Sequence, residues 1–179
     1  MNKSFVIPLL LFGLVSCQSS PLTPVNESVQ LPLHTGEFKL AFSKDNSDGT
    51  GKLVLYIPQR ETLDSWSQML SVQSLPAYRK SLSLTAHRLQ EDLNTRCGVK
   101  NVDWNIVQQT GESIIYETVV KNCGNAPDQY EMTRLFSGSN SLYRVSYVSK
   151  QTSQTQANRQ KWFNVIARAR LEAAPDRQE

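Results

Sequence analysis

The second half of the chain is dominated by short apolar-rich segments that turn-forming stretches separate. Four of them are rich in Val, Ile, Thr and Tyr: residues 102–107, 113–120, 129–136 and 142–148. Short segments of this composition at hairpin spacing indicate consecutive antiparallel strands. The pattern therefore predicts a meander.

The first half shows a second strand pattern and one segment of another kind. Residues 37–43 and 53–58 flank a segment dense in Asp, Asn, Ser and Gly, which predicts a hairpin. Residues 69–73 predict a further strand. Between these, residues 60–66 follow a proline and predict a short helical turn.

Two segments follow the helical period instead. The first is entered at residues 75–76 and stops at Cys97-Gly98, with apolar residues three or four positions apart: Tyr78, Leu82, Ala86, Leu89 and Leu93. The second covers residues 156–171 and places Trp162, Phe163, Ile166 and Ala169 on its inward face. Strands in a meander with two helices predict an α+β fold, in which two main helices pack on an antiparallel sheet.

The N-terminus carries a different signal. Asn2 and Lys3 precede an apolar run over residues 5–15. As a helix this run would extend about 16 Å, roughly half of the hydrocarbon core of a bilayer. It therefore has the length of the apolar region of a secretory signal rather than that of a membrane span.

The end of this run, Leu14-Val15-Ser16-Cys17, resembles the lipobox of bacterial lipoproteins. The resemblance implies that diacylglycerol is attached to the Cys17 thiol and that residues 1–16 are cleaved off. Two or more acyl chains would hold the protein on a membrane permanently. Gln18 stands where an Asp commonly retains such proteins in the inner membrane, which implies the outer membrane and a domain facing the periplasm. The alternatives are an ordinary secretory signal with a chance cysteine and the apolar N-terminus of an intracellular protein.

This interpretation divides the chain into four parts. Residues 17–35 would be the lipidated N-terminus and a flexible tether, because three prolines and many small polar residues occur there without a sustained period. Residues 36–172 would form one domain, and residues 173–179 a flexible tail.

With Cys17 assigned to lipid, Cys97 and Cys123 remain of the three cysteines. In an oxidising compartment we expect them to form a disulfide, which would close a loop of roughly 27 residues and stabilise the fold by about 3.5 kcal/mol. A metal site or a redox pair is the alternative. The histidines, His34 and His87, lie in the tether and in the first helix, and the C-x-x-C spacing of redox pairs is absent.

The order of elements, with paired strands, a helix, four strands and a final helix, resembles the PsbP/Mog1-like α+β class. A loose cadence in residues 56–70, with Pro58, Glu61, Trp66 and Met69, adds to this resemblance. The class includes small envelope lipoproteins of bacteria, which is in keeping with the lipobox.

Candidate chemistry is sparse. The formal charge of +3 is too small to predict nucleic-acid binding, and no phosphate-binding loop, nucleophile elbow or zinc-protease motif occurs. We therefore expect no cofactor and no metal. The carboxylates of Glu112, Glu117 and Glu131 could approach one another across paired strands, and His87 could act as a base, so these are the nominal residues of an unrecognised hydrolase.

The strands also carry aromatic residues at alternating positions, where cross-strand packing is their ordinary role: Trp104, Tyr116, Tyr130, Tyr143 and Tyr147. Trp66 and Trp162 are expected to anchor the core. The function that fits this sequence best is that of a non-enzymatic, membrane-anchored lipoprotein that binds a protein partner in envelope maintenance or in a secretion apparatus. A carrier with a small-molecule or lipid cavity between sheet and helix is the alternative, and a hydrolase ranks behind it.

Overall fold

The computed structural model describes residues 27–45, 51–75, 81–139 and 141–173. The elements follow in this order: β1 (Glu27–Gln30), β2 (Phe38–Asp45), β3 (Lys52–Pro58), β4 (Gln68–Leu75), α1 (Leu82–Cys97), the 3-10 turn η2 (Val99–Asn101), β5 (Val102–Gln109), β6 (Ser113–Val120), β7 (Gln129–Ser137), β8 (Leu142–Ser149), α2 (Gln156–Ala167) and β9 (Arg170–Ala173).

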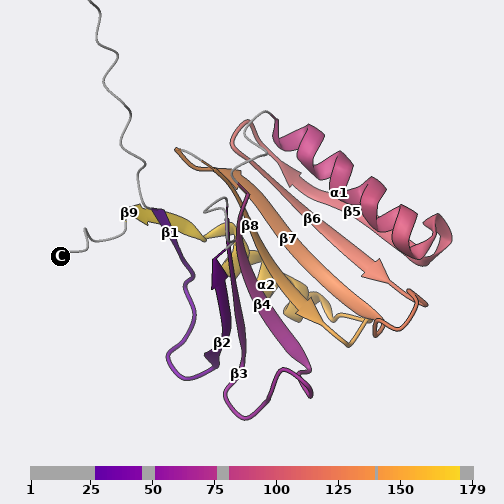
Figure 1. Cartoon of the computed structure of the whole chain (residues 1–179), viewed down its shortest axis with the longest axis horizontal. Coiled ribbons are helices and arrows are strands. Elements are labelled where there is room, and N and C mark those ends of the chain that lie inside the picture. Colours follow the sequence, from indigo (N-terminus) through magenta and orange to yellow (C-terminus); the bar gives the residue numbers. More distant parts are fainter. Residues whose placement is uncertain (1–26, 46–50, 76–80, 140, 174–179) are drawn as a thin grey trace, which may run out of the picture.

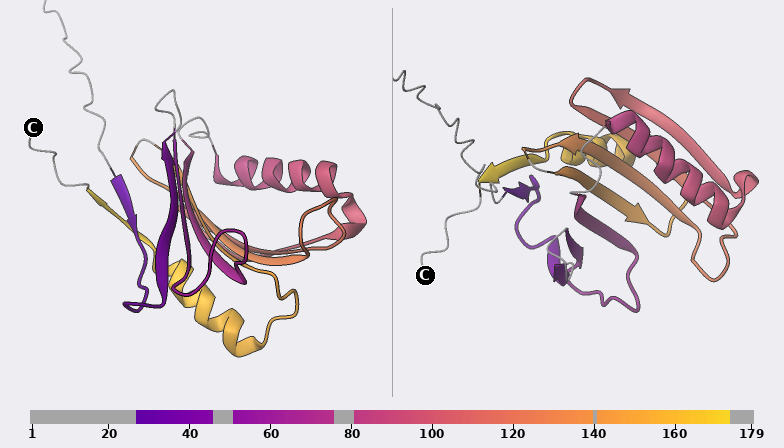
Figure 2. Two further views of the ribbon diagram at one scale, coloured as in Figure 1. Left: turned by 60° about the horizontal axis from the view of Figure 1, so that its bottom comes forward. Right: turned by 45° about the horizontal axis from the view of Figure 1, so that its top comes forward.

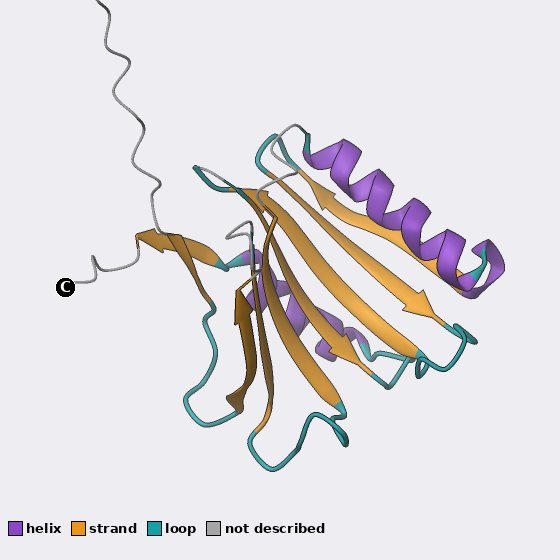
Figure 3. Ribbon diagram, viewed as in Figure 1, coloured by secondary structure: helices purple, strands orange, loops and turns teal. Residues whose placement is uncertain are grey.

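Within this described part, seven strands form one antiparallel sheet in the order β2-β3-β4-β8-β7-β6-β5 (Figures 1 and 3). Strand β8 returns to pair with β4, which joins the N-terminal hairpins to the later meander. The two helices cover opposite faces: α1 lies over β5, β6 and β7, and α2 lies under β7 and β8 (Figure 2). The predicted α+β class, with two main helices on an antiparallel sheet, is confirmed.

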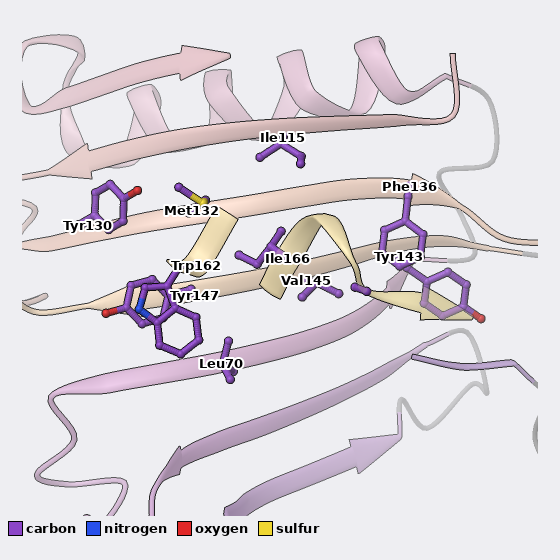
Figure 4. Close-up of a cluster of buried hydrophobic side chains, with 11 residues drawn as sticks. Leu70, Ile115, Tyr130, Met132, Phe136, Tyr143, Val145, Tyr147, Trp162 and Ile166 are labelled. Carbon is purple, nitrogen blue, oxygen red and sulfur yellow. The ribbon is translucent and has the colours of Figure 1, made fainter. Parts of the chain in front are cut away.

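The larger core lies between α2 and the sheet (Figure 4). Trp162 of α2 is 1% exposed, and its indole stacks on the ring of Tyr147 with 4.0 Å between ring centroids. Phe38 meets the same indole edge-on at 5.8 Å. Trp162 therefore anchors the core, as predicted. It can do so because the strands and the helix each present an apolar face to the other.

The end of α2 is held by a strand residue. Arg134 of β7 donates hydrogen bonds from Nη1 to the carbonyl oxygens of Ala167 and Ala169, each at 2.8 Å. Ala167 is the last residue of α2 and Ala169 lies just after it, at the end of the helix where backbone acceptors lack intrahelical partners and the helix dipole is negative. Burial lowers the pKa of Arg134, although the guanidinium remains charged at any physiological pH.

On the other face, α1 begins at Ser81, whose hydroxyl accepts a hydrogen bond from the Leu84 amide at 3.3 Å. Its first half packs on a smaller core that includes Ala86, Ile114 and Leu135. Its second half is joined covalently to the loop between β6 and β7. Cys97, the last helical residue, forms a disulfide with Cys123, with Cα atoms 4.5 Å apart. The expected disulfide is therefore present.

Strand β1 departs from the expectation of a flexible tether through residue 35. Residues 27–30 pair antiparallel with β9 in a separate two-stranded sheet, with Glu27 opposite Ala173. The Glu27 carboxylate also accepts a hydrogen bond from the Tyr143 hydroxyl at 3.2 Å. A four-residue strand that relies on a distant partner leaves no periodic trace in the sequence.

Three further features differ from those predicted. The helix α2 ends at residue 167, because Arg134 takes up its last carbonyls, and β9 then continues to residue 173 in place of a fraying end. Residues 60–66 form turns and no helix, since the Glu61 carboxylate binds the Ser67 amide and hydroxyl at 2.7 and 2.5 Å. Tyr78 lies outside the described residues, and α1 starts at residue 82.

Candidate functional site

A hollow of about 500 Å³ lies between the second half of α1 and the sheet. The disulfide, the β6–β7 loop and strands β5 to β8 complete its wall. Its apolar lining includes Leu89 and Leu93 from the helix and Trp104 and Tyr116 from the sheet, and its polar lining includes Glu131 and Arg144. Its volume and its mixed lining fall in the range usual for small-molecule sites.

The polar part of the hollow is an ion pair. Arg144 donates from Nη2 to Glu131 Oε1 at 2.6 Å, and the Thr133 hydroxyl donates to the same oxygen at 2.5 Å. Burial alone would raise the pKa of Glu131, but the charge of Arg144 and the Thr133 hydroxyl hold it below its ordinary value. The same pairing raises the pKa of Arg144 further. Both groups are therefore ionised in the folded protein.

Beside this pair lies the buried hydroxyl of Tyr116, which interacts with both Thr133 and Arg144. Tyr116 is 1% exposed, and its ring stacks on Trp104 with 4.0 Å between centroids. Burial, offset in part by Arg144 and reinforced by Glu131, raises the pKa of Tyr116 to about 12, so it stays protonated.

A second, shallower cavity of about 460 Å³ opens on the α2 side at the end of β6. Arg159 donates to both oxygens of Glu117, at 2.8 Å from Nε and 2.5 Å from Nη2, and the Tyr130 hydroxyl donates to the same carboxylate at 2.5 Å. Burial would raise the pKa of Glu117, but these donors lower it. Each of these donors has an acceptor, which describes a completed structural network.

The nominal hydrolase residues are not brought together. Glu131 lies directly opposite Thr118, the neighbour of Glu117 in β6, so the two carboxylates project to opposite faces of the sheet. Each is neutralised by its own arginine. Glu112 is exposed in a turn, and His87 is exposed on α1, 3.2 Å from Glu91. The hypothesis of a carboxylate pair is thus wrong.

The aromatic residues of the strands do pack across strands, as expected. Tyr130 and Tyr147 meet at 6.4 Å, and Phe136 and Tyr143 at 5.8 Å between centroids. Trp66 lies in a loop rather than in the core, with the Lys150 ammonium 4.5 Å from its ring centroid.

The two edges of the sheet differ in their protection. The edge strand β2 carries Lys39 and Lys44 and a bulge between Leu40 and Phe42. The edge strand β5 has one charged residue, Asp103, and exposes Ile106 by 49% and Val107 by 39%. Lysines and bulges are the usual devices that discourage strand addition. Both edges have a bulge and exposed apolar residues, which on β2 are Leu40 and Phe42, so the lysines of β2 are what distinguishes it from β5.

Sequence reasoning missed Arg144 as a site residue. A signal for Arg144 was present, because alternate residues of β8 read Leu142, Arg144, Ser146 and Val148, and a lone arginine on such a face needs a buried partner. Cys17, the predicted lipidation site, lies outside the described residues. In the described part of the chain no group of His, Cys, Asp and Glu could hold a metal, and no helix has the length and apolar character to cross a membrane.

Comparisons with known proteins give a distant likeness to a solved structure. No family model matches the chain, and no curated protein does. Among solved structures the chain is similar to a mutant form of the protein Mog1, with a TM-score of 0.41 and 10% identity. The match covers 77% of this chain and 97% of the other. The likeness is too distant to say anything about function.

Proposed function

We propose that this chain is a lipid-anchored envelope lipoprotein of the outer membrane, whose α+β domain faces the periplasm and binds a protein partner without catalysing a reaction. The anchor is supported by the lipobox at residues 14–17 and the short apolar run before it. The presence of a disulfide suits an oxidising compartment.

The observation that carries the partner role is the open edge at β5. An edge strand presents backbone donors and acceptors to any extended chain of matching shape. The side chains exposed there, Ile106 and Val107, are apolar, and Asp103 is the only charge on the strand. We therefore assign to this edge an extended, uncharged and partly apolar segment of another protein, added antiparallel or parallel to β5.

Photocrosslinking in intact membranes tests the partner role. A photoreactive residue at Val107 should capture a discrete protein, whereas the same residue at Glu91, on the exposed side of α1, should not. Ile106→Lys should weaken the capture, because a lysine on an edge strand disfavours the addition of another strand. A peptide from the captured segment should then shift the amide signals of β5 and leave those of β2 unchanged.

Two outcomes would count against this assignment. Capture of a second copy of the chain alone would make β5 a self-association edge. Capture that Ile106→Lys leaves unchanged would place the partner elsewhere.

The anchor is tested separately by metabolic labelling with a radioactive fatty acid. The wild-type chain should incorporate label and co-sediment with outer membranes, and Cys17→Ser should do neither. An unlabelled wild-type chain would contradict the lipoprotein assignment and leave the β5 proposal standing.

A further inference from the structure

The second cavity, of about 460 Å³, lies at the β5 edge of the sheet. Residues 103–105 of β5 line it, and β5 is the last strand on its side of the sheet (Figure 1). The floor continues over β6 and reaches Tyr130 of β7, and the far wall consists of the chain around Gln154 and of Arg159 on α2. A strand added to β5 would therefore border the cavity on the side opposite α2.

The register shows which side chains of an added strand would face this cavity. Asn105 lies opposite Glu117, and residues that oppose each other in paired strands share a face of the sheet. Asp103, two positions earlier, lies on the same face. Arg159 of α2 binds the Glu117 carboxylate, so this is the face that α2 covers. An added strand, about 4.8 Å from β5, would place every second side chain on it.

The walls of the cavity carry charges of both signs. Arg159 and Glu117 neutralise each other at 2.5 Å, and the Arg159 side chain is nevertheless 47% exposed. The carboxylate of Asp103 is exposed and has no hydrogen bond or ion pair with any described residue. A cation in the cavity would meet the like charge of Arg159, and an anion would meet the like charge of the carboxylates.

An uncharged amide matches both kinds of wall. Its NH₂ group donates to a carboxylate such as that of Asp103, and its oxygen accepts from a guanidinium. The guanidinium of Arg159 has five N–H groups, more than its contacts with Glu117 and Tyr130 occupy. Those contacts also hold the wall in place before a partner arrives, which lowers the entropy lost on binding.

From this geometry we infer that the cavity at residues 103–105 receives a side-chain amide of the partner, that of a glutamine in the extended segment that pairs with β5. The inference rests on the partner role proposed for β5 and adds the residue that makes the segment specific. In strand addition the main chain supplies affinity, and pockets for alternate side chains supply specificity. Glutamine is favoured over asparagine because the side chain must cross β5, and strands lie about 4.8 Å apart.

The test uses four capped, fluorescently labelled peptides of nine residues, built from threonine, valine and serine. They differ only in the central residue, which is glutamine, methionine, glutamate or lysine. Methionine has the length of glutamine without its amide, and the other two carry the two charges. Affinities for the full chain in lipid nanodiscs are measured by fluorescence anisotropy, with empty nanodiscs as the control.

The glutamine peptide should bind about five- to tenfold more tightly than the methionine peptide, the usual value of one hydrogen bond, and more tightly than either charged peptide. Asp103→Leu should remove this preference, because leucine offers the amide no acceptor. Gln108→Leu is the matched control and should preserve it, since Gln108 is an exposed residue of β5 outside the cavity. Ile106→Lys should weaken the glutamine and methionine peptides alike, because it acts on strand addition.

The outcomes separate this inference from the partner role of β5. Equal binding of the glutamine and methionine peptides, weakened by Ile106→Lys, would overturn the amide site and leave the β5 edge standing. Binding that Ile106→Lys leaves unchanged, or no saturable binding, would contradict the β5 edge and this inference with it. Tighter binding of a charged peptide would overturn the assignment of an uncharged side chain, and a preference that survives Asp103→Leu would overturn the role of Asp103 as its acceptor.

Discussion

The guanidinium of Arg144 lies 2.6 Å from the carboxylate of Glu131, and it reaches that carboxylate diagonally across two strands. The register places Glu131 opposite Val148 and Arg144 opposite Leu135, so the contact depends on the length of the arginine side chain. Glu131→Gln would leave the arginine charge buried without a partner. We expect it to lower the free energy of unfolding at neutral pH by about 3 kcal/mol, measured by denaturant titration.

The same carboxylates make stability sensitive to acid. The folded-state pKa values of Glu131 and Glu117 lie below the ordinary 4.5, so the unfolded chain binds protons at a higher pH than the fold does. Their contribution is complete above pH 4.5 and is lost as the pH falls below it.

Denaturant titrations from about pH 7 to about pH 3 should therefore show the free energy of unfolding falling in the acid range. Glu117→Gln and Glu131→Gln should each flatten that fall, and Glu112→Gln, at an exposed turn, should not. An equal slope in all three variants would be evidence against the two networks.

Arg134 is expected to matter through the carbonyls it binds. Arg134→Met would leave the oxygens of Ala167 and Ala169 without their donor and should reduce stability by about 2 kcal/mol. Thermal unfolding measures this, and Arg170→Met is the matched control, because Arg170 is exposed and contacts Glu172. A loss no greater than that of the control would mean that water replaces the guanidinium at no cost.

Gly138 leaves no room for a side chain. A Cβ built there would lie 2.5 Å from Glu27 Oε2 and from Tyr143 Cε2 and 2.9 Å from Leu171 Cδ1, so side chains of β1, β8 and β9 would have to shift. Gly138→Ala should therefore displace the β1–β9 pair and increase hydrogen exchange at Val29 and Leu171. Gly111→Ala, where nothing lies within 4 Å, should leave that exchange unchanged.

The disulfide should stabilise the second half of α1 most, because few apolar contacts hold that part of the helix. Replacing Cys97 and Cys123 together with alanine should cost about 3.5 kcal/mol on the chain-entropy model, and Cys17→Ser should cost nothing. Hydrogen exchange should rise first in the second half of α1, over the hollow, and not around Ala86. Uniform loss along the helix would indicate that the bond acts on the whole fold.

Local patterns in the sequence predicted the elements that are self-contained. The four strands of the meander were predicted from their composition and turn spacing, and the face of α1 from Leu82 to Leu93 from its helical period. Strands β6, β7 and β8 are buried on both faces, because a helix covers each side of the sheet. Strand β1 could not be found in this way. Its partner β9 lies at the other end of the chain, and neither strand is long enough to show a period.

The site was less predictable than the fold for a related reason. Glu117 and Arg159 are separated by 42 residues, and no spacing rule connects them. A shift of one residue in register moves Glu131 to the other face of the sheet. The sequence therefore indicated carboxylates on neighbouring strands, but not whether they share a face. The cysteine positions predicted a contact correctly, because a disulfide requires its two residues to lie close together.

The β1–β9 pair also determines how the domain bears mechanical load. Any tension on the chain ahead of residue 27 enters at Glu27, the end of β1 that lies opposite Ala173. The four residue pairs of β1 and β9 then bear the load first, while the seven-stranded sheet is held by longer ladders. The two-stranded sheet would thus yield first under a pull, lengthening the connection to the domain while the core and the hollow beneath α1 remain folded.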